Sequence, residues 1–183
     1  EQFLSAANKS LAYMDEDVEI APGRYLMEPM VFARLLQLAE IGENDLILDI
    51  GCATGYSSAV IARLADSVVA LEEDENLASE ATSLLTSLGV DNAAVVTGPL
   101  INGLAGEGPY DVIFLNGEIA KAPAELLDQL KDGGRLVAVI SGQNIGRARV
   151  FVRSGDTFSD MSAFDASSPL LPGFEPADPG FVF

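Results

Sequence analysis

Residues 46–56 read LILDIGCATGY, and this stretch decides the fold. It opens with the short apolar run of a buried strand, which ends next to Asp49. Small residues follow at every second position (Gly51, Ala53 and Gly55), and an apolar helical pattern begins after them. A strand, a tight turn and a helix start form a nucleotide cradle, because small residues let a ligand approach the backbone and the helix offers unpaired N–H groups.

The carboxylate of Asp49 indicates which nucleotide this cradle would accept. It would repel a pyrophosphate, whereas S-adenosylmethionine carries an ammonium group, a sulfonium and no phosphate. The dinucleotide fingerprint G-x-G-x-x-G is also unmet, because Ala53 and Tyr56 stand at its second and third glycine positions when it is aligned from Gly51. We therefore expect S-adenosylmethionine as the cofactor, with a dinucleotide and a purely structural turn as the alternatives.

A second apolar run, residues 68–71, ends in Glu72 and Glu73. An acid at the tip of the second strand, roughly 20 residues after the first glycine, suits hydrogen bonding to a ribose diol. Glu72 stands at that spacing from Gly51. It supports an adenosine ligand without choosing the cofactor, since dinucleotide-binding proteins use the same acid.

Other polar and small residues follow the ends of the remaining strands. Ligands of parallel sheets bind outside the carboxyl ends of the strands, so we expect Gly98, Pro99 and Leu100 to line the adenine. Asn116 would face the transferred methyl group or the substrate, unless it only forms a turn with Gly117. The predicted cofactor-binding residues are Asp49, Gly51, Cys52, Ala53, Gly55, Glu72, Glu73, Gly98, Pro99, Leu100 and Asn116.

The order of elements predicts an α/β fold, a doubly wound and mostly parallel sheet with an antiparallel C-terminal hairpin. We expect strands at 46–50, 67–71, 93–96, 111–115 and 136–140, and helices from Pro29 to before Gly42 and at 56–65, 74–88 and 123–131. Runs at 148–153 and 157–163 flank Ser154-Gly155-Asp156, which is typical of a hairpin turn. We therefore expect residues 1–165 to form a single domain. Residues 166–183 are rich in Pro and Gly, and we expect them to form an extended or partly disordered tail.

The net charge of the chain limits the classes of molecule that we expect it to bind. The 183 residues include 28 acids against 10 basic residues, a formal net charge of −18, with no basic cluster. Nucleic acid is therefore not an expected substrate, and anionic membrane surfaces are disfavoured. The apolar runs are too short to span a bilayer and the chain starts without a secretory signal, so we expect a cytoplasmic protein.

The chain contains no histidine, which excludes several mechanisms. A Ser-His-Asp triad and a Cys-His dyad cannot form within it, and with the single cysteine Cys52, interpreted as a packing residue, we expect no metal site. A nucleophile that is already ionised needs no base, and a substrate carboxylate with a pKa of ~4 is one. Methyl transfer to it requires mainly alignment and exclusion of water.

With these features the chain resembles the protein-L-isoaspartate O-methyltransferase family, within the Rossmann-like class I methyltransferases. The resemblance covers most of residues 20–164 and is carried by residues 20–29, 46–56, 68–77 and 126–140 and by Gln143. It implies a methyltransferase that uses S-adenosylmethionine and acts on a carboxylate of a protein or peptide, or on a small acid. Since family members usually carry more helix upstream, we also expect an N-terminal portion before Glu1.

The chain departs from the family pattern where the substrate is expected. The family shows I-S-x-P-H or a close variant before the first long helix, and its serine is treated as the active-site residue. Met27 stands at the place of that serine here, and Met30 stands where histidine or tyrosine is usual. A thioether cannot donate a hydrogen bond to a carboxylate. The family's G-D-G after the third strand is Gly98-Pro99-Leu100, and Ala53 replaces the middle glycine of the turn.

We therefore predict retained cofactor binding and slow methylation of isoaspartyl peptides. The catalytic residue is left unassigned, with Asn116 as the nearby candidate. A non-catalytic module that binds S-adenosylmethionine as a regulator or scaffold is the second hypothesis, which Met27 favours. A nicotinamide-dependent oxidoreductase is the third, and Asp49 and the missing glycine argue against it.

Overall fold

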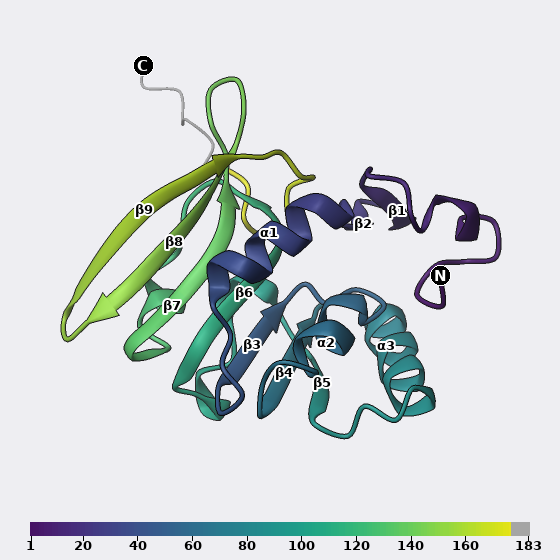
Figure 1. Ribbon diagram of the computed structural model, residues 1–183, viewed down its shortest axis with the longest axis horizontal. Helices are drawn as coiled ribbons and strands as arrows, with labels where there is room; N and C mark the ends of the chain where they lie inside the picture. The colour runs from purple at the N-terminus through teal and green to yellow at the C-terminus, as the bar shows by residue number, and fades with distance from the viewer. Residues whose placement is uncertain (177–183) are drawn as a thin grey trace, which may run out of the picture.

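The computed structural model describes residues 1–176, and a seven-stranded sheet forms its centre (Figure 1). The strand order is β5-β4-β3-β6-β7-β8-β9; the five strands from β5 to β7 are parallel and the last two antiparallel. The strands are β3 (Leu46–Ile50), β4 (Ser67–Glu72), β5 (Ala93–Thr97), β6 (Tyr110–Ile119), β7 (Leu130–Ile140), β8 (Arg147–Ser154) and β9 (Thr157–Asp165). The predicted doubly wound sheet with an antiparallel C-terminal hairpin is confirmed.

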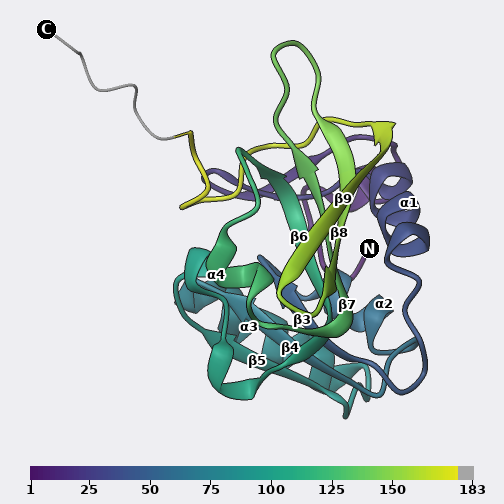
Figure 2. The same ribbon diagram turned by 90° about the vertical axis from the view of Figure 1, so that its left-hand side faces the viewer.

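Helices cover both faces of the sheet (Figure 2). They are α1 (Pro29–Ala39), α2 (Tyr56–Ile61), α3 (Glu75–Ser87) and α4 (Ala124–Leu127). One apolar cluster joins α1 and α2 to the sheet, and a second joins α4 to its other face. Among the described residues, no helix has the length and apolar character needed to cross a bilayer.

Local chemistry explains where the longer helices begin and end. Pro29 occupies the first turn of α1, where its missing N–H costs nothing, and the helix ends when Glu40 turns left-handed at φ 46°. This end comes before Gly42, the expected stop. Asp74 caps α3 by accepting the backbone N–H groups of Asn76 and Leu77 at 2.8 and 3.0 Å.

Two expected helices are shorter in the structure. α2 ends at Ile61 instead of residue 65, and α4 ends at Leu127 instead of residue 131. The prediction for 128–131 was wrong because Leu130 pairs with Tyr110 and already belongs to β7. Gly134 continues that strand in a tight space, since a Cβ there would lie 2.9 Å from the Tyr110 carbonyl oxygen.

An N-terminal hairpin, absent from the sequence prediction, precedes α1. It joins β1 (Val18–Ala21) to β2 (Arg24–Leu26) through a turn at Gly23, whose φ is 71°. A 3-10 helix, η1 (Lys9–Leu11), comes before it, and this N-terminal region extends to one side of the sheet (Figure 1). The hairpin carries Arg24 to the carboxyl ends of the strands, where it meets Glu72 of β4.

The segment after β9 crosses the same edge of the sheet (Figure 2). Pro169 accepts the N–H of Glu118 at 3.0 Å, and Leu171 donates its own N–H to the Glu118 carbonyl at 2.9 Å. Phe174 then accepts the N–H of Ala120 at 3.0 Å. Residues of the expected tail thus pair with the end of β6, and residues 177–183 lie outside the described part.

Candidate functional site

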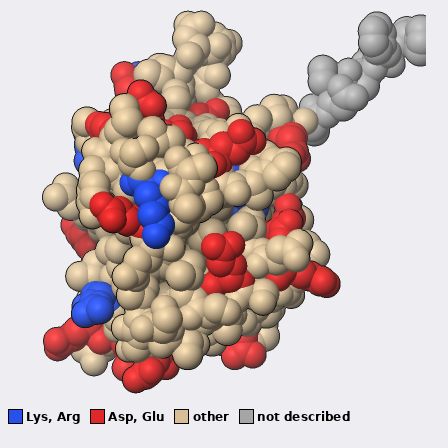
Figure 3. All heavy atoms as spheres, turned by 90° about the vertical axis from the view of Figure 1, so that its right-hand side faces the viewer, with Lys and Arg blue, Asp and Glu red and all other residues tan. Residues whose placement is uncertain are grey.

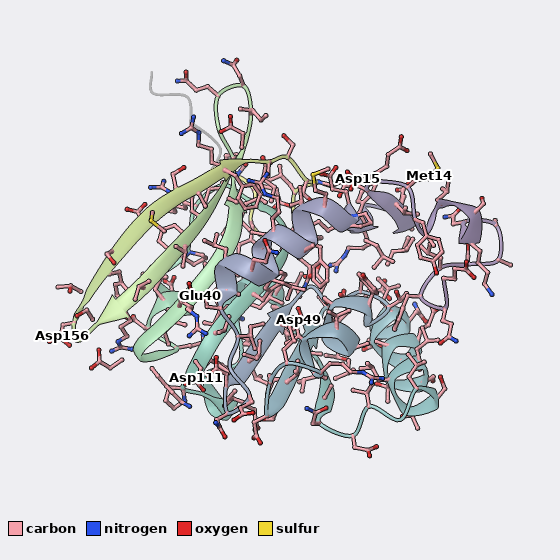
Figure 4. All side chains as sticks on the ribbon, viewed as in Figure 1. Met14, Asp15, Glu40, Asp49, Asp111 and Asp156 are labelled. Atoms are coloured by element: carbon pink, nitrogen blue, oxygen red, sulfur yellow. The ribbon has the colours of Figure 1, made fainter. Side chains whose placement is uncertain are left out.

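Asp49 lies at the end of β3 close to α2, whereas Asp111 lies at the opposite edge of the sheet (Figure 4). The Asp49 carboxylate is fully buried and accepts three side-chain hydrogen bonds. Its Oδ2 accepts from the hydroxyls of Ser57 at 2.7 Å and Ser58 at 2.5 Å, and its Oδ1 accepts from the Asn116 amide at 2.5 Å. Asp49 therefore ties β3 to α2 and β6. Its contact with a ligand stays a prediction.

Burial raises the pKa values of two side chains at this site, Asp49 and Cys52. Desolvation raises the pKa of Asp49 above its ordinary value, and the three hydrogen bonds oppose that rise. Burial also raises the pKa of the Cys52 thiol well above its ordinary value. Cys52 is 1% exposed, so its side chain is a neutral packing group beneath the turn and not a thiolate nucleophile.

The turn after β3 takes left-handed backbone at three positions. Gly51, Ala53 and Gly55 have φ values of 75°, 53° and 93°. A positive φ strains Ala53, because its Cβ crowds the backbone there. The glycine that the family pattern has at this position would adopt the same φ without strain. The turn is fastened to β4, because Gly51 donates its N–H to the Leu71 carbonyl at 2.8 Å and Ala53 donates to Glu72 Oε2 at 2.8 Å.

The Glu72 carboxylate is fully buried, and protein donors fill its acceptor positions. Oε1 accepts the N–H groups of Glu73 and Asp74 at 3.0 and 3.1 Å. Oε2 accepts the N–H of Ala53 and forms an ion pair of 2.6 Å with Arg24. A carboxylate offers about four lone-pair sites, so a ribose diol would have to displace one of these donors.

The space beside the turn is filled as well. The Leu171 side chain packs over the backbone of Gly51 and Gly117. A Cβ added to Gly51 would lie 2.8 Å from Leu171 Cδ2, and a Cβ added to Gly117 would lie 2.6 Å from Leu171 Cγ. Leu100 also packs there, since its Cδ1 would lie 3.7 Å from the same added Cβ on Gly51. The cavity next to the turn measures about 10 Å³, whereas ligand pockets measure about 300–1,000 Å³. In this conformation the crevice does not accommodate S-adenosylmethionine.

The structure brings most of the predicted binding residues to one edge of the sheet. Leu100 meets the Gly51 turn, and Asn116 meets Asp49. Gly98 lies beside β4, where its N–H donates to the Glu72 backbone carbonyl at 3.0 Å. Pro99 adjoins it and precedes the 3-10 helix η2 (Leu100–Asn102). The Glu73 side chain is exposed; only its backbone N–H contacts Glu72.

Sequence reasoning missed Arg24 and Leu171, the two residues that close the crevice. Pro22-Gly23 is a turn signal that could have indicated the hairpin carrying Arg24. Leu171 had no comparable signal, because it stands among prolines and glycines that favour an extended tail.

A larger hollow opens on the other side of Met27. It measures about 590 Å³, and most of its lining is apolar, with Val18, Leu26, Met27 and Tyr56 among it. The polar residues Glu1, Gln2 and Glu16 also line it. Met27 also borders the 10 Å³ cavity at the turn, so it stands between the closed crevice and the open hollow.

Acidic side chains spread across the face that carries the N-terminal region, with few basic ones among them (Figure 3). With 28 acids against 10 basic residues in the chain, this distribution does not favour binding of a phosphodiester backbone.

Comparison with known proteins supports a particular family. The family model described as Protein-L-isoaspartate(D-aspartate) O-methyltransferase matches residues 1–165. A relative from Roseiflexus castenholzii named protein-L-isoaspartate O-methyltransferase is 34% identical over 93% of this chain and 79% of its own length. One of the same name from Vibrio atlanticus is 33% identical over 94% of this chain and 83% of its own.

Solved structures share the fold. A protein-L-isoaspartate O-methyltransferase structure superposes with a TM-score of 0.83 at 24% identity, over 94% of this chain and 58% of that chain. A structure from Plasmodium falciparum, titled as a putative enzyme of the same name in complex with S-adenosyl-L-homocysteine, gives a TM-score of 0.78 at 18% identity over 93% of this chain and 84% of its own.

Proposed function

Since the chain belongs to the protein-L-isoaspartate O-methyltransferase family, we propose that it transfers a methyl group from S-adenosylmethionine to a carboxylate of a protein or peptide. The family consists of S-adenosylmethionine-dependent O-methyltransferases. The observation that most supports the proposal for this chain is the left-handed turn from Gly51 to Gly55, tied directly to the Glu72 carboxylate at the end of the neighbouring strand. This pairing of turn and acid suits an adenosine ligand.

The binding residues would be those at the strand ends. The Gly51 turn would receive the ligand against its backbone, Leu100 would line the adenine, and Glu72 would accept the ribose hydroxyls once Arg24 leaves it. When bound, the cofactor supplies a methyl group on a sulfonium. Asn116 stands half-buried in β6 and borders the small cavity at the turn, where it would face the transferred methyl group.

The acceptor carboxylate needs no general base, which suits a chain without histidine. We place the acceptor in the hollow beside Met27, which adjoins the turn through that residue. The apolar side chains of its lining would reduce the water around the acceptor, and exclusion of water favours transfer to a carboxylate. Met27 offers that carboxylate no hydrogen-bond donor, so we expect slow methylation of isoaspartyl peptides.

Substitution at this position tests the acceptor assignment. Met27→Ser restores a hydroxyl donor, and we expect it to raise the rate of methyl incorporation into an isoaspartyl peptide on the order of tenfold, the effect of a hydrogen bond to a charged group. Met161→Ser is the control, because Met161 is 58% exposed on β9. Equal rates in the two variants would contradict the role given to position 27.

A non-catalytic binding module is the second candidate. Met27 favours it, because a thioether supplies no hydrogen-bond donor for an acceptor carboxylate. Calorimetric titration with S-adenosylhomocysteine, with NAD as the comparison ligand, combined with a methyl-transfer assay, separates the candidates. Binding of the first ligand together with methyl incorporation supports the enzyme. Binding without incorporation into any peptide or protein carboxylate supports the module, and preference for NAD would refute both.

A further inference from the structure

We propose that the segment from Pro169 to Phe174 is a built-in competitor of the cofactor: Leu171 and Arg24 hold the crevice closed, and S-adenosylmethionine binds only after this segment leaves the end of β6. The inference rests on the proposed function, because it concerns regulation of the same site. Three groups of contacts carry it: those of Arg24, those of the segment backbone, and those of the Leu171 side chain.

The first group concerns the acid expected at the ribose. Arg24 Nη2 lies 2.6 Å from Glu72 Oε2, and the two side chains are 6% and 0% exposed. The other guanidinium nitrogen, Nη1, is buried and has no hydrogen-bond partner within residues 1–176. An unsatisfied buried N–H costs free energy. Arg24 therefore blocks the ribose position of Glu72 in an arrangement that is less favourable than a fully hydrogen-bonded one.

The second group concerns how the segment is attached. It forms a short parallel bridge between Leu170 and Glu118 and shares three backbone hydrogen bonds with Glu118, in β6, and Ala120, which directly follows β6. These few bonds lie at the end of the strand, beyond the irregular pairing of β6 with β7 between Phe114 and Glu118. Besides these bonds, the side chains of Leu171 and Phe174 are buried in the apolar cluster on that face of the sheet. With few backbone bonds and only these two buried side chains, the segment should open with a lower free energy than the centre of the sheet does.

The third group concerns what holds the segment in the crevice. Leu171 is 4% exposed and packs against Gly51 and Gly117, whereas the adjacent Leu170 is 40% exposed. The Leu171 side chain therefore lies in the space through which a ligand would approach the turn. Because ligand and side chain exclude one another there, the apparent dissociation constant equals the intrinsic one divided by the open fraction.

Two matched substitutions test this competition. Leu171→Asp replaces the buried apolar side chain that covers the Gly51 turn with a shorter, charged one, which should release the segment. Leu170→Asp adds the same charge to the same segment on its exposed side. We expect Leu171→Asp to bind S-adenosylhomocysteine at least tenfold more tightly than the unaltered chain in calorimetric titration, and Leu170→Asp to bind as the unaltered chain does.

Hydrogen exchange on the unaltered chain gives a second measurement that needs no variant. The Leu171 and Ala120 amides donate to Glu118 and Phe174, so NMR should find them protected in the free protein. Saturation with S-adenosylhomocysteine should lower their protection at least tenfold, while the Val137 amide in the centre of β7 keeps its own.

The outcomes separate the competition from the proposed function. Binding of S-adenosylhomocysteine with the same affinity by all three proteins, or with Leu171 protection intact at saturation, overturns the competition alone. Absence of binding even by Leu171→Asp, after exchange has shown its segment released, overturns the proposed function and the competition together.

Discussion

Replacing Asp49 with alanine should destabilise the protein by about 2–3 kcal/mol. The substitution removes the acceptor of three donors, the hydroxyls of Ser57 and Ser58 and the amide of Asn116. A buried donor left unsatisfied costs about 1–3 kcal/mol. The low end applies to each, because the hydroxyls can rotate to helix carbonyls and Asn116 keeps its bond to the Ile50 carbonyl at 3.1 Å. The substitution also removes a carboxylate whose burial is unfavourable, and this offsets part of the lost stability.

Asp49→Asn should cost less than about 1 kcal/mol, because its oxygen still accepts from Asn116 and its amide can donate to the two serine hydroxyls. Urea unfolding followed by circular dichroism measures both variants. With a urea slope of about 2 kcal/mol per molar, the alanine variant should unfold at ~1 M lower urea. Asp91, exposed at the surface, is the control for Asp→Ala. Equal destabilisation by Asp49→Ala and Asp49→Asn would refute the hydrogen-bonding role.

Three further effects should be measurable by urea or thermal unfolding. Because burial raises the pKa of Asp49 above 3.8, the folded protein holds that proton to higher pH than the unfolded chain. Stability should therefore fall as pH rises from 3.8 through the folded pKa, and Asp49→Asn should lack this fall. Ala53→Gly should stabilise by about 0.5–1 kcal/mol by relieving left-handed strain, whereas Ala59→Gly inside α2 should destabilise by about 1 kcal/mol. Asp74→Ala should lower the melting temperature at neutral pH. Since the backbone N–H of the cap lowers the Asp74 pKa from 3.8, that difference should vanish as pH falls through the folded pKa; a difference that persists in acid would contradict the cap.

The sequence was sufficient for the parallel core because its strands are short apolar runs bounded by turn residues. β3 begins and ends at Leu46 and Ile50, where the pattern placed it. The sequence failed at residues 128–131, where leucines at helical spacing continue the pattern of α4. Pairing of Leu130 with Tyr110 decides that segment, and pairing between strands is a tertiary effect that helical periodicity does not report.

The candidate site was predictable to the extent that topology determines it. Parallel strands end at one edge, so Asp49, Glu72 and Asn116 were expected there without knowledge of any contact. The closing residues were not predictable, because their contacts join distant parts of the chain. Arg24 and Glu72 are 48 positions apart, and Leu171 reaches Gly51 from the segment that follows the last strand.

The departures from the family pattern and the closing contacts lie mostly on segments that cross the edge of the sheet. Met27 follows the N-terminal hairpin, and Leu171 belongs to the segment after β9, whereas the turn keeps its left-handed geometry even with Ala53 in it. Access of the cofactor to its site and the choice of methyl acceptor can therefore change while the turn from Gly51 to Gly55 does not. Leu171→Asp should then alter the apparent affinity for the cofactor, and Met27→Ser the rate at saturating cofactor. A double variant should show both effects independently, because each acts through a different segment.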